Sequence, residues 1–145
     1  MTTIKQYQKF STEYTTIQMA LPDTEPRCTE LCTLAGVTYV AVPDGVVLPL
    51  QPEEITVKDV VLTAELIAAI KAESPHTQLI DVRIREKIRE RYDAEGEMYC
   101  ARVSVGALMG IYVMEPGEQA AVLAYSAYIE SVRQWGRDQR TALGL

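Results

Sequence analysis

The sequence has no long apolar run. Its apolar stretches are short and interrupted, as in residues 37–42, whereas a membrane-spanning helix needs about 20 predominantly apolar residues. Residues 1–9 also lack the basic segment and the apolar core of a secretory signal. We therefore expect no membrane partner and a cytoplasmic location.

Cysteine and histidine are scarce. The chain has three cysteines, Cys28, Cys32 and Cys100, and one histidine, His76. An odd and small number of cysteines does not suit a disulfide-stapled scaffold, and the spacing from Cys28 to Cys32 is wider than in the close cysteine pairs of structural zinc sites. In an extended chain the two would lie roughly 13 Å apart. We interpret the cysteines as small buried hydrophobic residues and predict no metal and no cofactor.

Positive charge is also limited. Twenty acidic residues against fourteen basic ones give a net charge of −6, which disfavours nucleic acid as a partner because unspecific binding grows with the number of neutralised phosphates. The glycines of residues 106–110 lack the spacing of a nucleotide-binding loop. The carboxylates carry no flanking catalytic signature. We therefore predict that the protein is not an enzyme. The open alternative is an enzyme that uses dispersed carboxylates.

Residues 30–48 carry the clearest strand pattern. Three short segments rich in β-branched residues are separated by the turn signals Ala35-Gly36 and Asp44-Gly45, which allow the chain to reverse. The segments are residues 30–34, 37–42 and 46–48. They predict an antiparallel β-meander.

Three helices begin at recognisable signals. Thr63 can cap a helix over residues 63–73, Ser74-Pro75 supplies a cap and a favoured first helical residue, and Pro116 opens the last helix. With 48% hydrophobic and 23% charged residues, the chain has the composition of a globular protein. We predict an α+β fold: a β-rich N-terminal subdomain over residues 1–62, with an antiparallel β-meander, followed by a C-terminal helical bundle over residues 63–145.

Two segments allow more than one structure. In residues 1–27, Ile4, Tyr7 and Phe10 are spaced like one side of a short helix, whereas residues 15–19 suit a strand. Residues 97–113 alternate well enough for a strand, but their length and their methionine, alanine and leucine content favour a helix that is apolar nearly all round. We predict a buried helix there.

A basic cluster is the most prominent surface feature. Ile80, Ile84, Ile88 and Tyr92 form one helical apolar stripe at roughly 100° per residue. Five basic residues flank it: Arg83, Arg85, Lys87, Arg89 and Arg91. They either border a core-facing stripe with snorkelling side chains or form a contact surface for an acidic protein or a phosphate backbone. The net negative charge elsewhere favours a protein partner.

The C-terminal helix carries a short heptad-like seam. Its positions alternate in steps of three and four: Val122, Tyr125, Ile129, Val132, Gly136, Gln139 and Leu143. Only the first four are consistently apolar. They amount to about two heptads, which is short of the three to four that argue for a coiled coil. The seam suits an intramolecular helix contact or self-association. For the second use we predict a homo-oligomer with an interface that includes Tyr125, Tyr128, Ile129, Val132 and Trp135.

One set of residues in the C-terminal half is distinctive. It comprises residues 74–92 (SPHTQLIDVRIREKIRERY), Tyr99, Ala101, Arg102, residues 132–137 (VRQWGR) and residues 142–145 (ALGL). In these residues the chain resembles small proteins from the tail and tail-fibre gene region of tailed bacteriophages and prophages. The resemblance covers residues 63–145, and its motif is helical and non-catalytic. It implies a tail-associated or morphogenetic role, in the bacterial cytoplasm or incorporated in the virion.

These observations predict a non-enzymatic structural or assembly protein, chaperone-like in its action, that binds a phage tail or tail-fibre component. One alternative is a phage-encoded inhibitor of a host nucleic-acid or defence protein, which would require carboxylates clustered on one exposed face. A second is a carboxylate-dependent enzyme, which would require a deep pocket with perturbed polar groups.

The cysteine interpretation predicts the metal content. Purified protein should contain no stoichiometric zinc, and a chelator should leave its melting temperature unchanged, because buried thiols that pack as hydrophobic groups hold no metal. Elemental analysis and thermal melts with and without chelator measure this. One zinc per chain would overturn the interpretation.

Overall fold

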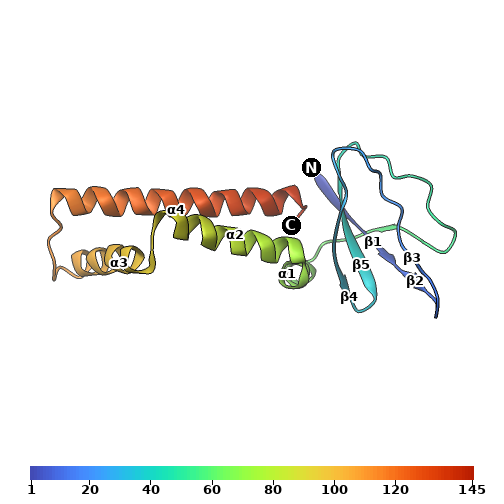
Figure 1. Ribbon diagram of the computed structural model, residues 1–145, viewed down its shortest axis with the longest axis horizontal. Helices are drawn as coiled ribbons and strands as arrows, with labels where there is room; N and C mark the ends of the chain where they lie inside the picture. The colour runs from blue at the N-terminus through green and yellow to red at the C-terminus, as the bar shows by residue number, and fades with distance from the viewer. The chain divides into compact units, whose positions relative to one another are not determined.

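The structure is a computed structural model that describes all 145 residues, and it shows an α+β fold, which confirms the predicted class (Figure 1). The chain folds into two compact units, Met1–Leu79 with Gln139–Leu145, and Ile80–Asp138. Strands give way to helices between Asp59 and Ala64, near the predicted boundary at residue 62, whereas the two compact units divide after Leu79.

The first unit is built on a four-stranded antiparallel sheet. Its strand order is β4-β5-β1-β6, and a separate two-stranded ribbon pairs β2 with β3. The strands are β1 (Thr2–Gln8), β2 (Phe10–Ser11), β3 (Thr16–Ile17), β4 (Thr29–Leu34), β5 (Val37–Pro43) and β6 (Lys58–Asp59). β4 and β5 and the turn between them lie where the sequence predicts them.

The predicted meander is wrong in its third strand. Residues 46–48 form no strand, and β1 pairs with β5 along its whole length instead. The chain does turn at Gly45, which has a φ of +80°, but the following segment runs into Pro49 and Pro52, which have no N–H to give to a ladder. The helical alternative for residues 1–27 is also wrong, because β1 and β3 occupy this part of the chain.

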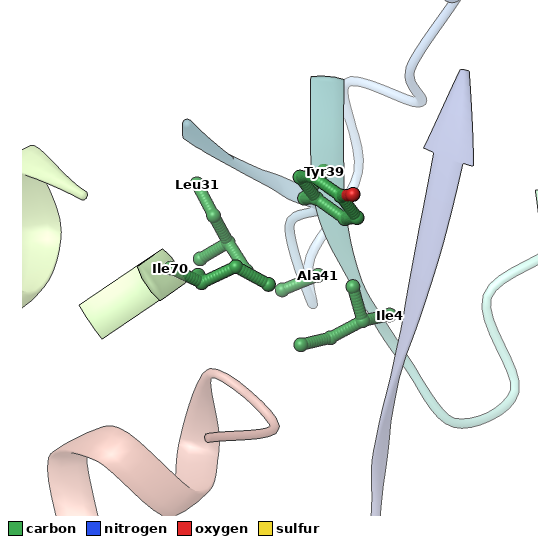
Figure 2. Packing of buried hydrophobic residues seen from close by; sticks show 5 residues of the cluster. All are labelled: Ile4, Leu31, Tyr39, Ala41 and Ile70. Carbon is green, nitrogen blue, oxygen red and sulfur yellow. The ribbon is translucent and has the colours of Figure 1, made fainter. Parts of the chain in front are cut away.

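Both faces of the sheet are buried. On one face a cluster of Ile4, Leu31, Tyr39, Ala41 and Ile70 forms the core, and Figure 2 shows Ile70 reaching from α1 toward the strands. On the other face Tyr7, Met19, Val40, Val42 and Ile55 form a second cluster. Because side chains alternate along a strand, β1 and β5 contribute to both clusters.

Residues 142–145 belong to the first of these clusters. Leu143 and Leu145 pack against it, and the Thr2 hydroxyl donates a hydrogen bond of 2.9 Å to the Ala142 carbonyl. Gly144 has a φ of +79°, and a Cβ atom there would lie 3.1 Å from the Thr2 carbonyl oxygen. Glycine therefore lets this segment approach β1 closely.

Four helices follow the strands, three at the predicted N-terminal signals and one within the segment predicted as a buried helix. They are α1 (Ala64–Glu73), α2 (Pro75–Arg91), α3 (Ala94–Leu108) and α4 (Pro116–Ala142). The predicted starts at Thr63, Pro75 and Pro116 are confirmed, and the Thr63 side chain accepts from the Leu66 N–H at 3.2 Å. The Ser74 hydroxyl is not the predicted cap. The hydroxyl oxygen is buried without a hydrogen-bond partner. Ser74 instead closes α1, because its N–H donates to the Ile70 carbonyl.

The helix predicted within residues 97–113 is confirmed as α3, but its burial is not. Cys100 and Val103 are buried, whereas Met98, Val105 and Leu108 on the other side are exposed. The helical spacing does not mark which side faces solvent, because apolar residues occur on nearly all sides of the helix.

The turn between β4 and β5 offers a test of the fold. Ala35 and Gly36 both have positive φ, +47° and +82°, in a two-residue hairpin that pairs Leu34 with Val37. Asparagine tolerates this conformation better than alanine, so Ala35→Asn should raise the free energy of unfolding by about 1 kcal/mol. Ala35→Val is the matched control and should lower it, because a β-branched side chain is strained at positive φ. Urea unfolding measures both, and an Ala35→Asn variant less stable than the wild type would contradict the turn.

Candidate protein-interaction surface

Within the unit Ile80–Asp138, α3 and the C-terminal part of α2 lie along α4 (Figure 1). Tyrosine side chains link the helices. The Tyr128 hydroxyl donates to the Lys87 carbonyl at 2.6 Å, and the Tyr125 hydroxyl donates to a Glu97 carboxylate oxygen at 3.3 Å. α4 is therefore fastened to α2 at one position and to α3 at another.

Aromatic contacts reinforce this packing. The Tyr92 ring meets the Tyr125 ring edge to face with centroids 4.9 Å apart, and it lies 5.8 Å from the Tyr128 ring. Such pairs add about 0.5–1.5 kcal/mol beyond the area they bury. Val132 is only 4% exposed, Ile129 is half-buried, and the Trp135 ring lies 5.0 Å from the Lys87 ammonium group.

The heptad-like seam thus makes an intramolecular contact, one of the two uses that its spacing allows. All five residues predicted for an interface between copies are engaged or at least half-buried within their own unit: Tyr125, Tyr128, Ile129, Val132 and Trp135. An interface between copies through these residues stays a prediction that would require the helices to separate.

The basic cluster divides into two groups. Lys87 lies over Trp135, Arg91 lies 4.6 Å from the Tyr128 ring, and Arg89 forms a 2.8 Å ion pair with Glu97. Arg83 and Arg85 are exposed and make no ion pair or side-chain hydrogen bond. Only these two arginines are therefore available to an acidic partner without breaking a contact within the chain.

The turn between α3 and α4 is the most unusual surface of the molecule. Residues 103–114 contain no charged residue, although the chain has 34 charged side chains in total. Five apolar side chains of this region are exposed, and we call them the apolar tip: Val105 (53%), Leu108 (87%), Met109 (66%), Ile111 (76%) and Val113 (88%). Exposed apolar surface gathered in one place marks interaction sites in soluble proteins.

The apolar tip has a defined backbone. The N–H groups of Ile111 and Tyr112 both donate to the Gly106 carbonyl, at 3.0 and 3.1 Å, and Gly110 adopts a φ of +71°. A Cβ atom on Gly106 would lie 3.1 Å from the Tyr112 Cβ. Glycines at these two positions therefore let the chain fold back tightly on the end of α3.

One carboxylate holds this turn against α4. Glu118, in the first turn of α4, accepts hydrogen bonds from the Tyr112 hydroxyl, from the Tyr99 hydroxyl at 2.7 Å and from the Glu115 N–H at 3.0 Å. These bonds lower the pKa of Glu118, with Tyr112 as the largest cause. The same hydrogen bond raises the pKa of Tyr112 to about 12. These hydrogen bonds tie the turn that carries the apolar tip to the start of α4.

A shallow groove of about 400 Å³ lies beside the apolar tip. Residues of α3 and of the following turn line it: Ala101, Arg102, Val105, Gly106, Met109 and Ile111. The sequence did not single out this surface. Two signals could have found it, namely the uncharged run over residues 103–114 and the apolar residues on every side of α3.

Two of the three cysteines lie apart from this surface, whereas Cys100 is buried on the inner side of α3. Cys28 packs against the second core cluster of the sheet and Cys32 against the first. Burial raises the pKa of both thiols, and the Glu73 carboxylate raises that of Cys32 further. Both therefore carry the protonated form that favours packing over metal binding. His76 is exposed near the start of α2.

Comparison with models of known protein families, with curated proteins and with solved structures found no match for this chain. None of its helices is both long enough and apolar enough to cross a membrane.

The carboxylate of Glu118 predicts a pH dependence of the turn. Its pKa lies below the ordinary 4.5, so its stabilisation is present above that pH and is lost as the pH falls through the lowered value. The pKa of Tyr112 lies above the ordinary 10.0, so its contribution is complete below pH 10 and is lost as the pH rises through about 12. In Glu118→Gln the pKa of Tyr112 should fall back toward 10.

Tyrosinate absorbance measures this change, with Tyr112→Phe identifying the signal of Tyr112 among the eight tyrosines. Glu130→Gln is the matched control, since Glu130 is an exposed glutamate of α4 that pairs with Arg137. An unchanged tyrosine titration in Glu118→Gln would show that the carboxylate does not hold the turn.

Proposed function

We propose that the chain is a non-enzymatic, phage-encoded interaction protein that acts in the assembly or structure of a tail or tail fibre. Its apolar tip supplies the protein contact that this role needs. The observation that carries the proposal is the exposure of five apolar side chains on an ordered, uncharged turn.

Energetics favour a protein as the occupant of such a surface. Burying one exposed apolar side chain under a partner contributes about 1.5–3 kcal/mol to the free energy of binding. A side chain that faces solvent does not make this contribution. The hydrogen bonds to Gly106 and Glu118 already order the turn, so a partner that binds it loses little further conformational entropy. An ordered apolar turn is therefore suited to specific docking.

The phage setting is supported by the resemblance of residues 63–145 to proteins of the tail and tail-fibre gene region. In that setting the chain would act in the bacterial cytoplasm during assembly or as part of the virion. Arg83 and Arg85 add two unpaired positive charges to the helical unit, which suits an acidic region of a tail or fibre partner.

Co-purification tests the proposal. The chain should be co-expressed in turn with each tail and fibre protein encoded beside its gene, and at least one should co-purify with it in a fixed ratio. Leu108→Asp with Met109→Asp should reduce the amount retained by about tenfold or more, because a buried unpaired carboxylate opposes the contact.

Val47→Asp is the matched control, since Val47 is 86% exposed in the sheet unit and outside the apolar tip. It should leave the complex intact. Failure of every tail and fibre protein to co-purify, or equal losses in the control, would overturn the proposed function.

A further inference from the structure

The sheet unit has a recess of about 340 Å³ at the outer edge of β1. Polar residues of β1 and of the segment that leads into β6 line most of it: Gln6, Tyr7, Gln8, Glu54, Thr56 and Lys58. Its volume lies at the lower end of the roughly 300–1,000 Å³ that small-ligand sites enclose. The recess therefore has the size of a site for a small ligand.

The recess exists because β6 covers only part of β1. The two strands pair only at Lys5 and Gln6, and residues 54–57 form no strand. Ile55 and Val57 pack against the second core cluster instead. The outer edge of β1 beside Tyr7 and Gln8 thus has no strand partner. Because backbone groups alternate in direction along a strand, one of these two residues directs its N–H and C=O toward the open edge.

The polar side chains around the recess are not used by the fold. Five of them make no side-chain hydrogen bond and no ion pair within the chain: Gln6, Gln8, Glu54, Thr56 and Lys58. The adjacent pair Lys5 and Asp59, by contrast, forms an ion pair. One cation, one anion and two amides therefore stand free at the same recess.

A buried hydroxyl group on the same face also lacks a partner. Tyr39 is only 8% exposed and lies opposite Gln6 in the register of β1 and β5, so the two side chains are neighbours on one face. Its hydroxyl group makes no hydrogen bond within the chain, and its oxygen is not fully enclosed. Figure 2 shows this oxygen on the side of the ring that faces β1. Since the hydroxyl group of a buried tyrosine usually has a partner, a ligand beside Gln6 can supply the missing one.

We propose that the recess binds a short extended peptide with free ends. Its backbone lies along the open edge of β1 and forms hydrogen bonds that β6 leaves unmade. The amides of Gln6 and Gln8 both donate and accept, as the peptide groups of such a ligand do. Lys58 attracts the terminal carboxylate, and Glu54 attracts the terminal ammonium group. This site goes beyond the proposed function and uses no residue of the apolar tip.

The spacing of the two charges sets the length of the peptide. Glu54 and Lys58 are four residues apart, so their Cα atoms are separated by at most about 13 Å. An extended tripeptide spans roughly 10 Å. Its opposite end charges then fall near the two opposite side chains. An uncharged internal segment of a longer protein would leave both side chains unpaired.

A titration of the full-length, ¹⁵N-labelled chain with trialanine tests the site. Amide resonances of residues 6–8 and 54–58 should shift and saturate, with a dissociation constant of about 1 mM because few contacts are made. Shifts that fail to saturate up to about 20 mM, or that are scattered over both units, would overturn the inference.

Blocked peptides test the two end contacts. Trialanine amide lacks the carboxylate and N-acetyl-trialanine lacks the ammonium group, so each should bind about twofold to fivefold more weakly, as expected for exposed ion pairs. Lys58→Gln should weaken trialanine by the same factor and leave the binding of trialanine amide unchanged. Glu54→Gln should do the same for trialanine and N-acetyl-trialanine. Equal losses for the free and the blocked peptide would overturn the assigned contacts.

Glu53→Gln is the matched control, since Glu53 is the exposed neighbour of Glu54 and does not line the recess. It should leave all three affinities unchanged. Circular dichroism verifies that each variant is folded. If sodium propionate shifts the same resonances with the affinity of trialanine, the recess takes small carboxylates and the peptide is excluded.

Tyr39→Phe tests the buried hydroxyl group. The change removes one oxygen that has no partner in the chain, so the urea midpoint should not fall. Binding of trialanine should weaken by about twofold to tenfold, the effect of one lost hydrogen bond. An unchanged affinity would contradict the placement of the ligand beside Gln6.

Discussion

Burial of strand β5 on both faces is the constraint on which the sheet unit depends. The strand lies between β4 and β1, and its residues alternate between two apolar clusters. A sheet with two apolar faces must pack against other parts of the chain on both faces. Helix α1, which follows the last strand, packs against one of them. Segments without regular structure around Met19 and Ile55 form the second cover. Much of the chain that has no regular structure in this unit is thus packed against the sheet.

The helical unit distributes its contacts differently. Tyr125 and Tyr128 fasten α4 to its neighbours through ring packing and through hydroxyl groups that reach a carboxylate and a carbonyl. Nearer the start of α4, Glu118 accepts hydrogen bonds from the hydroxyl groups of Tyr99 and Tyr112 and so links the turn to α4. Apolar side chains that could have formed a core there face solvent. Stability and docking therefore use separate parts of the same helices.

The sequence predicted what local chemistry determines and missed what distant pairing determines. The cap at Thr63, the start of α4 at Pro116, the turn at Ala35-Gly36 and the helical state of α3 follow from neighbouring residues. The pairing of β1 with β5 joins residues that are far apart in the chain, so local spacing does not predict it. The exposed side of α3 was missed for a related reason, because a uniformly apolar helix carries no polar side to mark the solvent. The basic cluster was visible from spacing, but the engagement of Lys87 and Arg91 by aromatic rings was not.

The packing of Leu143 and Leu145 onto the cluster that contains Ile4 has a consequence for biosynthesis. The first strand leaves the ribosome long before these leucines are translated, so one face of the sheet stays incompletely covered while the intervening residues are made. The unit can reach this packing only once both leucines are available. A chain that stops before them leaves part of the apolar cluster uncovered.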